Sequence, residues 1–266
     1  MNLFSRRKKA TSPVFPKEIF TNKIDDLKPL PHGIPGGIDI YDHRFYFHDA
    51  RCFYDSYLEI LHDEIYKFKP TSAKPLIIDC GANMGVSVIY FAKEHPAATI
   101  VAFEPEEGIY EVLQKNIASY GLTNVDLHKK AVWDAVTVLE FTTDHGMGGS
   151  VANTFSNQAP VKVETVRLAD YLTQPVDFLK LDIEGAEYTV LKDCEPLLKN
   201  VQNLFVEYHS FVHKEQKLEE ILAMLKQAGF RYHLKQSFSQ QRPFVDRLLA
   251  CENMDMAITV FAYREA

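Results

Sequence analysis

The segment from residue 76 to residue 85 constrains the fold of this chain more than any other part of its sequence. It reads Leu-Ile-Ile-Asp-Cys-Gly-Ala-Asn-Met-Gly, in which the apolar run is typical of a buried strand and the glycines indicate a turn into a helix. Because glycine lacks Cβ, the chain can turn tightly at Gly81 and Gly85, and a ligand can approach the main chain there. The first N–H groups of the following helix would face that ligand. The turn therefore predicts a seat for a nucleotide-like cofactor.

The spacing of the glycines indicates which cofactor the turn can take. A dinucleotide fingerprint requires a second glycine two residues after the first, where the pyrophosphate presses on the backbone. Asn83 stands at that position, and its side chain would occupy the space. No Gly-Lys-Ser/Thr run is present to hold a triphosphate. The pattern Asp79-x-Gly81-x-x-x-Gly85 instead resembles the first motif of class I S-adenosylmethionine (SAM) methyltransferases, whose cofactor contains no phosphate.

Length and composition favour one α/β domain with extensions. The chain has 266 residues, and 46% of them are hydrophobic, which is enough for a substantial core. Its four cysteines form no Cys-x-x-Cys pair, which argues against a zinc site or a disulfide framework and indicates a reducing, cytoplasmic location. A net charge of −7 argues against nucleic-acid binding, so a small-molecule or carbohydrate acceptor is the expected partner. The basic run at residues 6–9 has no apolar run after it, so neither export nor a membrane span is predicted.

Residues 1–70 are predicted to form an N-terminal extension and an aromatic-rich cap, and residues 71–266 the methyltransferase domain. Prolines between residues 13 and 35 indicate a largely extended lead-in. Alternating apolar residues predict a hairpin over 37–49, and near-helical spacing predicts a helix over 53–68. The last two segments contain nine aromatic residues. Core packing against the main sheet is the favoured role for them, and a stacking wall for a sugar is the alternative.

Beyond residue 74 the apolar patterns alternate between strand and helix, which is typical of a Rossmann-like α/β sheet. We expect this sheet to be mostly parallel, with an antiparallel last strand and helices on both faces. Predicted strands cover residues 76–80, 99–103, 125–130, 176–181 and 203–208, with a final pair at 230–234 and 256–263.

Two loops are candidates for acceptor selection. Three glycines within residues 146–150 indicate either a flexible hairpin tip or a lid over the bound substrates. The segment 236–253 separates the last two strands and is polar at first. We expect it to shape acceptor choice as well.

The second predicted strand ends in Phe103-Glu104-Pro105, and Glu104 lies 23 residues beyond Gly81 (104 − 81). In Rossmann-like sheets an acid about 20 residues after the glycine turn lies at the tip of the neighbouring strand, where it can accept hydrogen bonds from ribose hydroxyls. The alternative is an unrelated surface glutamate. Because strand end, spacing and glycine turn coincide, we interpret Glu104 as a ribose-binding residue.

Further acids follow the next two strands. Asp182 and Glu184 come where the strand 176–181 meets its helix, and ligands of open α/β sheets collect at such carboxyl ends. Glu187 lies one turn into the helix, where a favourable interaction with the helix dipole is sufficient explanation. Strand side chains alternate, so Glu207 and His209 share one face and can reach the same pocket.

Three segments together resemble the FkbM-type methyltransferases: residues 79–85, residues 103–105, and Leu181-Asp182-Ile183-Glu184-Gly185-Ala186-Glu187. The resemblance implies transfer of the SAM methyl, usually to a hydroxyl oxygen of a sugar or secondary metabolite. It also implies that the turn at Ala131 and Val132 lies near the adenine, whereas Asp134 is better explained as a local turn residue. The cofactor contacts that it implies are Asp79, Gly81, Ala82, Asn83, Gly85, Glu104, Ala131 and Val132.

Methyl transfer requires alignment of the acceptor oxygen and removal of its proton. We assign the base to His209 or Glu207; His209 has the more suitable ordinary pKa, and Glu207 would need burial to raise its own. The alternative for His209 is a hydrogen-bonded histidine at a strand end without catalytic duty. Asp182 and Glu184 are assigned to orienting the methionine amino group of the cofactor and the acceptor.

No metal site is assigned. A divalent cation held by Asp182, Glu207 and His209 is the less favoured alternative, because oxygen-rich Mg²⁺ sites usually show more closely spaced carboxylates.

Two rival functions stay open from the residues alone. A nicotinamide-dependent oxidoreductase would use a similar fold, but Asn83 opposes its pyrophosphate. A non-catalytic module could keep the nucleoside pocket and bind a glycan through the aromatic cap.

Overall fold

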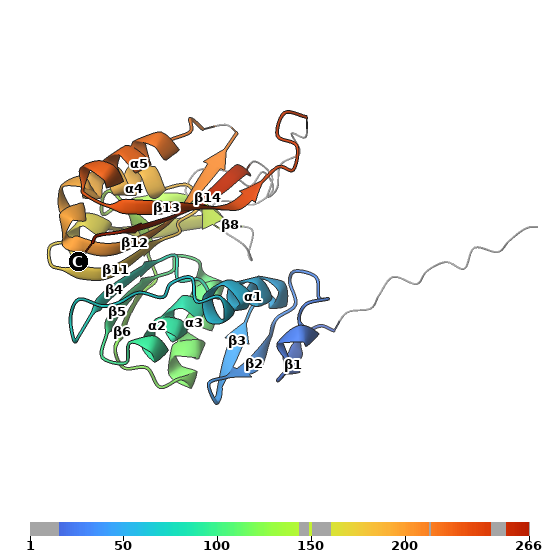
Figure 1. Ribbon diagram of the computed structural model, residues 1–266. Helices are drawn as coiled ribbons and strands as arrows, with labels where there is room; N and C mark the ends of the chain where they lie inside the picture. The colour runs from blue at the N-terminus through green and yellow to red at the C-terminus, as the bar shows by residue number, and fades with distance from the viewer. Residues whose placement is uncertain (1–15, 144–148, 151–160, 213, 246–253, 266) are drawn as a thin grey trace, which may run out of the picture.

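The computed structural model describes residues 16–143, 149–150, 161–212, 214–245 and 254–265. Seven strands form the central sheet in the order β13-β14-β12-β11-β4-β5-β6 (Figure 1). All neighbouring pairs from β12 to β6 are parallel, and β14 is antiparallel to both β12 and β13. The predicted Rossmann-like sheet with an antiparallel last strand is therefore confirmed. The strands are β4 (Leu76–Cys80), β5 (Thr99–Phe103), β6 (Val125–His128), β11 (Val176–Leu181), β12 (Val201–Phe211), β13 (Arg231–Ser239) and β14 (Met254–Tyr263).

Helices cover both faces of this sheet, as predicted (Figure 1). Helices α2 (Val86–Glu94) and α3 (Glu107–Ser119) lie on one face, and α4 (Glu187–Cys194) and α5 (Leu218–Gln227) lie on the other. The chain after α3 turns at Gly121 and the chain after α5 turns at Gly229, both with positive φ. Glycine tolerates that conformation, which explains why the two helices end where the sequence predicts.

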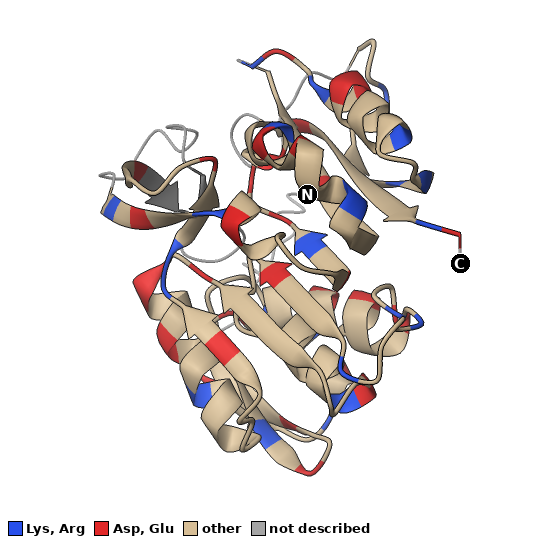
Figure 2. Ribbon diagram, turned by 90° about the vertical axis from the view of Figure 1, so that its left-hand side faces the viewer, with Lys and Arg blue, Asp and Glu red and all other residues tan. Residues whose placement is uncertain are grey.

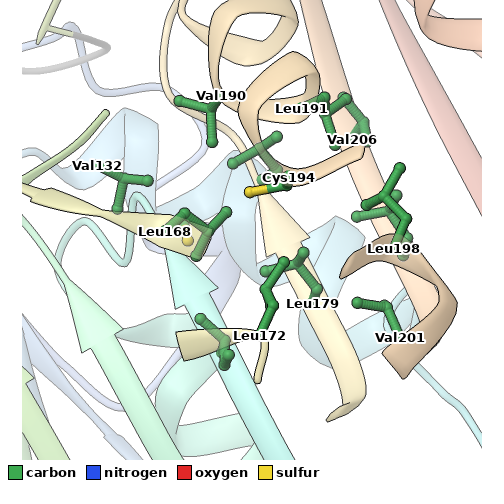
Figure 3. Close-up of a cluster of buried hydrophobic side chains, with 14 of the residues drawn as sticks. Val132, Leu168, Leu172, Leu179, Val190, Leu191, Cys194, Leu198, Val201 and Val206 are labelled. Carbon is green, nitrogen blue, oxygen red and sulfur yellow. The ribbon is translucent and has the colours of Figure 1, made fainter. Parts of the chain in front are cut away.

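The face under α4 and α5 carries one apolar core. Figure 3 shows Val190, Leu191 and Cys194 of α4 packed with Leu179 of β11 and Val206 of β12. All five side chains are fully buried. Strand β11 is buried along its whole length, which fits the nearly continuous apolar run of a strand covered on both faces.

The N-terminal cap packs on the opposite face. It contains a short parallel strand β1 (Ile19–Thr21), a 3₁₀ turn η1 (Ile24–Asp26), the hairpin β2 (Gly36–Ile40) and β3 (His43–Phe47), α1 (Ala50–Ser56) and the π-helical turn η2 (Tyr57–His62). The predicted hairpin is confirmed. The predicted helix over 53–68 is too long, since the helical segment ends at His62, six residues before Phe68 (68 − 62).

The aromatic residues of the cap serve mainly as core. Phe45, Phe47, Phe53 and Tyr66 are buried and belong to the same apolar cluster as Ile77 of the central sheet. The favoured prediction of core packing is therefore confirmed for these residues. The boundary near residue 70 stays a prediction, because cap and sheet share this core.

A second, four-stranded sheet lies beside the main one, in the order β7-β10-β8-β9, and the sequence did not predict it. Its strands are β7 (Ala131–Trp133), β8 (Val138–Thr143), β9 (Gly149–Ser150) and β10 (Val161–Arg167). Residues 131–132 were expected as a turn after the third strand, and this expectation is wrong. Ala131 and Val132 pair in parallel with Thr165 and Val166 of β10. The partner strand is more than 30 residues away in the sequence, so local pattern alone could not reveal it.

The remaining segments are short. The 3₁₀ turn η3 (Leu168–Tyr171) lies between β10 and β11, and the 3₁₀ turn η4 (Glu195–Asn200) lies between α4 and β12. The polar segment 236–253 begins as a continuation of β13 through Ser239. Residues 246–253, residues 146–148 of the proposed lid and the basic run at residues 6–9 lie outside the described residues.

Charged residues lie mainly on helices, loops and strand ends, and the central strands are largely uncharged (Figure 2). Among the described residues, no helix combines the length and the apolar character needed to cross a membrane.

Candidate active site

The turn between β4 and α2 has the geometry that the sequence predicts, but the reason for its glycines is different. Gly81 and Gly85 both have positive φ, at 87° and 93°. A Cβ at Gly81 would overlap the backbone carbonyl oxygen of Asp182, and a Cβ at Gly85 would meet Leu113 Cδ1 at 2.5 Å. Both glycines are therefore required by contacts within the protein. These contacts explain both glycines without any need for space for a ligand.

The backbone N–H groups of this turn are used internally. Gly81 and Ala82 both donate to the carbonyl oxygen of Phe103, Gly85 donates to Ala82, and Met84 donates to the side-chain oxygen of Asn83. These bonds occupy the turn itself; the expectation that the first N–H groups of the following helix, from Val86 onward, face the ligand stays a prediction. A turn without spare donors suits a ligand that lacks phosphate.

Asp79 stabilises this turn through buried contacts with Ser87 and Lys180. Its side chain is fully buried; Oδ2 accepts a hydrogen bond from Ser87 Oγ at 2.5 Å, and Oδ1 lies 3.4 Å from Lys180 Nζ. These partners give Asp79 a structural role at the base of α2. Its predicted contact with the cofactor stays a prediction.

Lys180 is a site residue that the sequence analysis missed. It is buried near the carboxyl end of β11, donates to the carbonyl oxygen of Gly81 at 2.7 Å, and lies 3.3 Å from Asp182 Oδ2. Burial alone would lower the pKa of Lys180, but Asp182 and Asp79 outweigh it and hold the pKa well above its ordinary value. Lys180 is therefore a permanent cation that joins β11 to the glycine turn. Its sequence signal is a positive charge inside an otherwise mainly apolar strand.

Glu104 lies at the tip of β5, as predicted, next to the glycine turn. Its Oε2 accepts from the backbone N–H of Asn83 at 3.0 Å, and its Oε1 accepts from that of Glu106 at 2.9 Å. Burial raises the pKa of Glu104 to about 7, against the effect of these two hydrogen bonds. Each carboxylate oxygen has further lone-pair sites, so ribose hydroxyls could still donate to it.

The carboxyl ends of β11 and β12 bring Asp182, Glu184, Glu207 and His209 together. Burial raises the pKa of Glu184 to about 8, and burial together with repulsion from Asp182 raises the pKa of Glu207 to about 7. His209 Nε2 lies 3.5 Å from Glu184 Oε2 and 4.0 Å from Asp182 Oδ1. Burial alone would lower the pKa of His209, but the carboxylates of Glu184 and Glu187 outweigh it and raise the pKa well above its ordinary value.

Glu187 holds the imidazole of His209 in place, a role that the sequence analysis missed. The Glu187 side chain is 1% exposed, and its Oε1 accepts from the backbone N–H groups of Gly185 and Ile183 at 2.9 and 3.3 Å. The same oxygen lies 3.0 Å from His209 Nδ1. The dipole explanation for Glu187 is therefore incomplete, because this carboxylate fixes which nitrogen of His209 points to the neighbouring acids.

These groups line one cavity of about 410 Å³, here named the Gly81 cavity. Of the predicted site residues, the lining includes Gly81, Ala82, Asn83, Asp182, Glu184, Glu207 and His209. Asp79, Gly85, Glu104, Ala131 and Val132 are not in its lining. The cap contributes Cys52, Ser56, Glu59 and Tyr66, and β13 contributes Ser237 and Phe238. Sequence reasoning missed these contributors because only the fold brings them to the sheet edge.

The chain belongs to a recognisable family. The FkbM methyltransferase domain matches residues 79–232, which is more than half of the chain. "Methyltransferase 1" of Beauveria bassiana is 27% identical over 162 residues, 52% of this chain and 65% of that protein, so this chain spans just under two thirds of that relative.

Two further relatives have more specific names. The "31-O-demethyl-FK506 methyltransferase FkbM" of Streptomyces tacrolimicus is 23% identical over 211 residues, 65% of this chain and 80% of that protein. The "2-O-methyltransferase NoeI" of Sinorhizobium fredii is 24% identical over 155 residues, 50% of this chain and 63% of that protein.

The matched residues contain the glycine turn, Glu104 and the cluster at the ends of β11 and β12. At the position where a dinucleotide would need a glycine, the chain has Asn83, which disfavours the oxidoreductase alternative. The chain therefore belongs to the FkbM methyltransferase family.

Proposed function

We propose that this enzyme transfers the methyl group of SAM to a hydroxyl oxygen of a sugar or secondary metabolite. One observation carries the proposal: the glycine turn and the cluster of Asp182, Glu184, Glu207 and His209 line the same cavity. A methyl donor on the turn and an acceptor hydroxyl beside the cluster would therefore meet in one cavity. The names of two relatives, an O-demethyl-FK506 methyltransferase and a 2-O-methyltransferase, support oxygen as the acceptor atom.

The chemistry of the turn suits SAM. Its N–H groups already have partners inside the protein, so they offer no phosphate site, and SAM carries none. Glu104 would accept hydrogen bonds from the ribose hydroxyls, and Asp182 would bind the amino group of the methionine part. When bound, SAM supplies an electrophilic methyl group on a positively charged sulfur.

The residues at the ends of β11 and β12 would remove the proton of the acceptor hydroxyl. Glu207 and Glu184, with pKa values raised to about 7 and about 8, titrate where a general base works well. His209, with its pKa held well above the ordinary value, enters as an imidazolium and must lose its own proton before it could act as a base. Between the two residues first assigned as base, this favours Glu207.

The cap would contribute to acceptor binding. Ser56, Glu59 and Tyr66 line the Gly81 cavity, and they offer hydroxyl and carboxylate groups. Such groups bind hydroxyl-rich ligands through hydrogen bonds. This composition supports a sugar or another polyhydroxylated acceptor.

The test is methyl incorporation from methyl-labelled SAM into a library of hydroxylated acceptors, including oligosaccharides, with the modified atom identified by mass spectrometry and NMR. The proposal expects labelled methyl ethers and a loss of about 10²-fold or more in kcat for Glu207→Gln, the range for a lost general base. Binding of SAM without transfer to any acceptor would favour the non-catalytic module. Preferential binding of NAD over SAM in a parallel titration would favour an oxidoreductase.

A further inference from the structure

The Gly81 cavity is rich in acidic side chains. Asp55, Glu59, Asp182, Glu184 and Glu207 all line it. One lysine, Lys180, lines it as well, but its ammonium group already contacts Asp79, Asp182 and the carbonyl oxygen of Gly81. Crowded carboxylates repel one another unless a cation or a proton lies among them.

Three of the cavity's side chains are arranged as ligands of one cation. An oxygen of Asp182, an oxygen of Glu207 and a ring nitrogen of His209 all lie within 4.8 Å of one another. In six-coordinate geometry at about 2.1 Å, ligand atoms are separated by about 3 to 4.2 Å, so small side-chain movements would complete the set. Glu207 and His209 share one face of β12, and Asp182 follows the neighbouring strand β11.

The orientation of His209 is the second, independent observation. Its ring is buried, and its Nδ1 is held at 3.0 Å by Glu187, whose carboxylate is itself fixed by two backbone N–H groups. Nε2 consequently points toward Asp182 and Glu184. A histidine that binds metal through one ring nitrogen usually has its other ring nitrogen hydrogen-bonded to a carboxylate. Glu187 is that carboxylate for Nδ1 of His209.

A second cluster with suitable residue types is a poorer candidate. His32, Asp49 and Cys52 also lie within 4.8 Å of one another. Asp49, however, caps helix α1: Oδ1 accepts from the N–H groups of Arg51 and Cys52, and Oδ2 accepts from that of Gly33. Its two oxygens therefore already accept three backbone hydrogen bonds, which gives Asp49 a structural role.

We propose that Asp182, Glu207 and His209 bind a divalent cation that holds and activates the acceptor hydroxyl. Two carboxylates and one imidazole suit Mn²⁺ or Mg²⁺, with Mn²⁺ tolerating the nitrogen ligand better. The inference deepens the proposed function and rests on it for the role of the ion. It changes the assignment made from sequence, which gave these three residues catalytic roles and no metal.

With the ion bound, Glu207 is a ligand, so the role of base that the proposed function gives to Glu207 passes to Glu184. With Asp182, Glu207 and His209 as ligands, Glu184 is the neighbouring carboxylate that stays available. In the transfer step the acceptor O–H bond breaks and its proton passes to Glu184, while the oxygen forms a bond to the methyl carbon. The bond between that carbon and the sulfonium sulfur breaks with its electron pair staying on sulfur, which leaves a neutral thioether.

The test is a titration of the EDTA-treated full chain with Mn²⁺, followed by electron paramagnetic resonance, in which the signal of free Mn²⁺ disappears on binding. The proposal expects one site in the wild type and a loss of affinity of about ten-fold or more in Glu207→Gln and in His209→Gln. His32→Gln is the matched control from the second cluster and should bind Mn²⁺ as the wild type does. Circular dichroism checks that each variant is folded.

Three results would overturn the inference: no Mn²⁺ binding by the folded wild type, unchanged affinity in both cluster variants, or loss of binding in His32→Gln alone. The fate of the proposed function is measured separately, by calorimetry with S-adenosylhomocysteine and by methyl transfer. Methyl transfer at full rate after EDTA treatment, with no Mn²⁺ bound, would remove the cation and leave the methyltransferase proposal intact. Mn²⁺ binding at the cluster without methyl transfer would support the cation site and remove the methyltransferase proposal.

Discussion

Single residues in this site differ in how far the sequence reveals their roles. Glu104 was found from its distance to Gly81 and from its place at a strand end, and the structure sets it beside the glycine turn. Lys180 and Glu187 were not assigned to the site. Their roles depend on partners on other elements, Gly81 for one and His209 for the other, and such pairings arise only when strands and helices assemble.

Glu104 makes cofactor binding depend on pH. Burial raises the pKa of Glu104 to about 7, so its carboxylate, which is the form that accepts two ribose hydroxyls, predominates only above that pH. Affinity for S-adenosylhomocysteine should therefore rise between pH 6 and pH 8. Glu104→Ala should weaken binding by about 1–3 kcal/mol at pH 8 and remove this rise.

Isothermal calorimetry at the two pH values measures both effects. Glu107→Gln, at an exposed glutamate three residues along the chain (107 − 104), is the control and should keep the pH dependence of the wild type. If affinity for S-adenosylhomocysteine rises equally between pH 6 and pH 8 in Glu104→Ala and in the wild type, Glu104 does not bind the ribose.

Lys180 should be important for stability. Replacing it with methionine leaves Asp79 and Asp182 close together without their shared cation, a change that costs roughly 3–5 kcal/mol when one partner of a buried pair is removed. Urea denaturation measures the loss. Lys192→Met breaks an exposed pair with Glu195 and should change the free energy of unfolding little. If the two variants are equally stable, the buried cation does not hold β11 to the turn.

Elements with strong local patterns were predicted well, and elements with distant partners were not. Strands β4, β5 and β11 follow from their apolar runs, and the ends of α3 and α5 follow from Gly121 and Gly229. The predicted helix of the cap was too long, because Ile65 and Phe68 continue the apolar spacing although the helical segment stops at His62. Strand β10 pairs with β7 and β8 from distant parts of the chain, so the second sheet was missed.

The glycine turn should tolerate no side chain at Gly81. Alanine there would combine a strained positive φ with overlap between its Cβ and the Asp182 carbonyl oxygen, so β4 and β11 would have to separate. We expect Gly81→Ala to lose both stability and cofactor binding. Gly121→Ala is the matched control, since Gly121 also has a positive φ, of 61°, but no atom within 4 Å of the added Cβ.

The control should show only the strain, about 1 kcal/mol. Thermal unfolding and binding of S-adenosylhomocysteine measure both variants. Equal effects at the two positions would show that the contact with Asp182 is unimportant.

At the scale of the whole molecule, cap and sheet form one structure with two apolar cores. One core lies under α4 and α5, and the other joins the cap to the opposite face of the sheet. The cap also lines the Gly81 cavity together with residues of the sheet. Stability of the cap and closure of the active site are therefore linked.

A core substitution in the cap should weaken the entire protein. Phe53 is fully buried in the cluster that includes Ile77 of the central sheet, so Phe53→Ala should lower the free energy of unfolding by about 3–5 kcal/mol in a single transition. Phe244 is 95% exposed, and Phe244→Ala should have little effect. Two separate transitions in urea, one of them unaffected by Phe53→Ala, would show that the cap folds independently.

The central claim is that the Gly81 cavity holds the methyl donor beside the cluster at the ends of β11 and β12. A crystal structure with bound S-adenosylhomocysteine tests it most directly. The account predicts the ribose at Glu104, the amino-acid part near Asp182 and the sulfur facing the side of the cavity lined by Glu207 and His209. A nucleoside bound elsewhere, with the glycine turn and the cluster untouched, would contradict it.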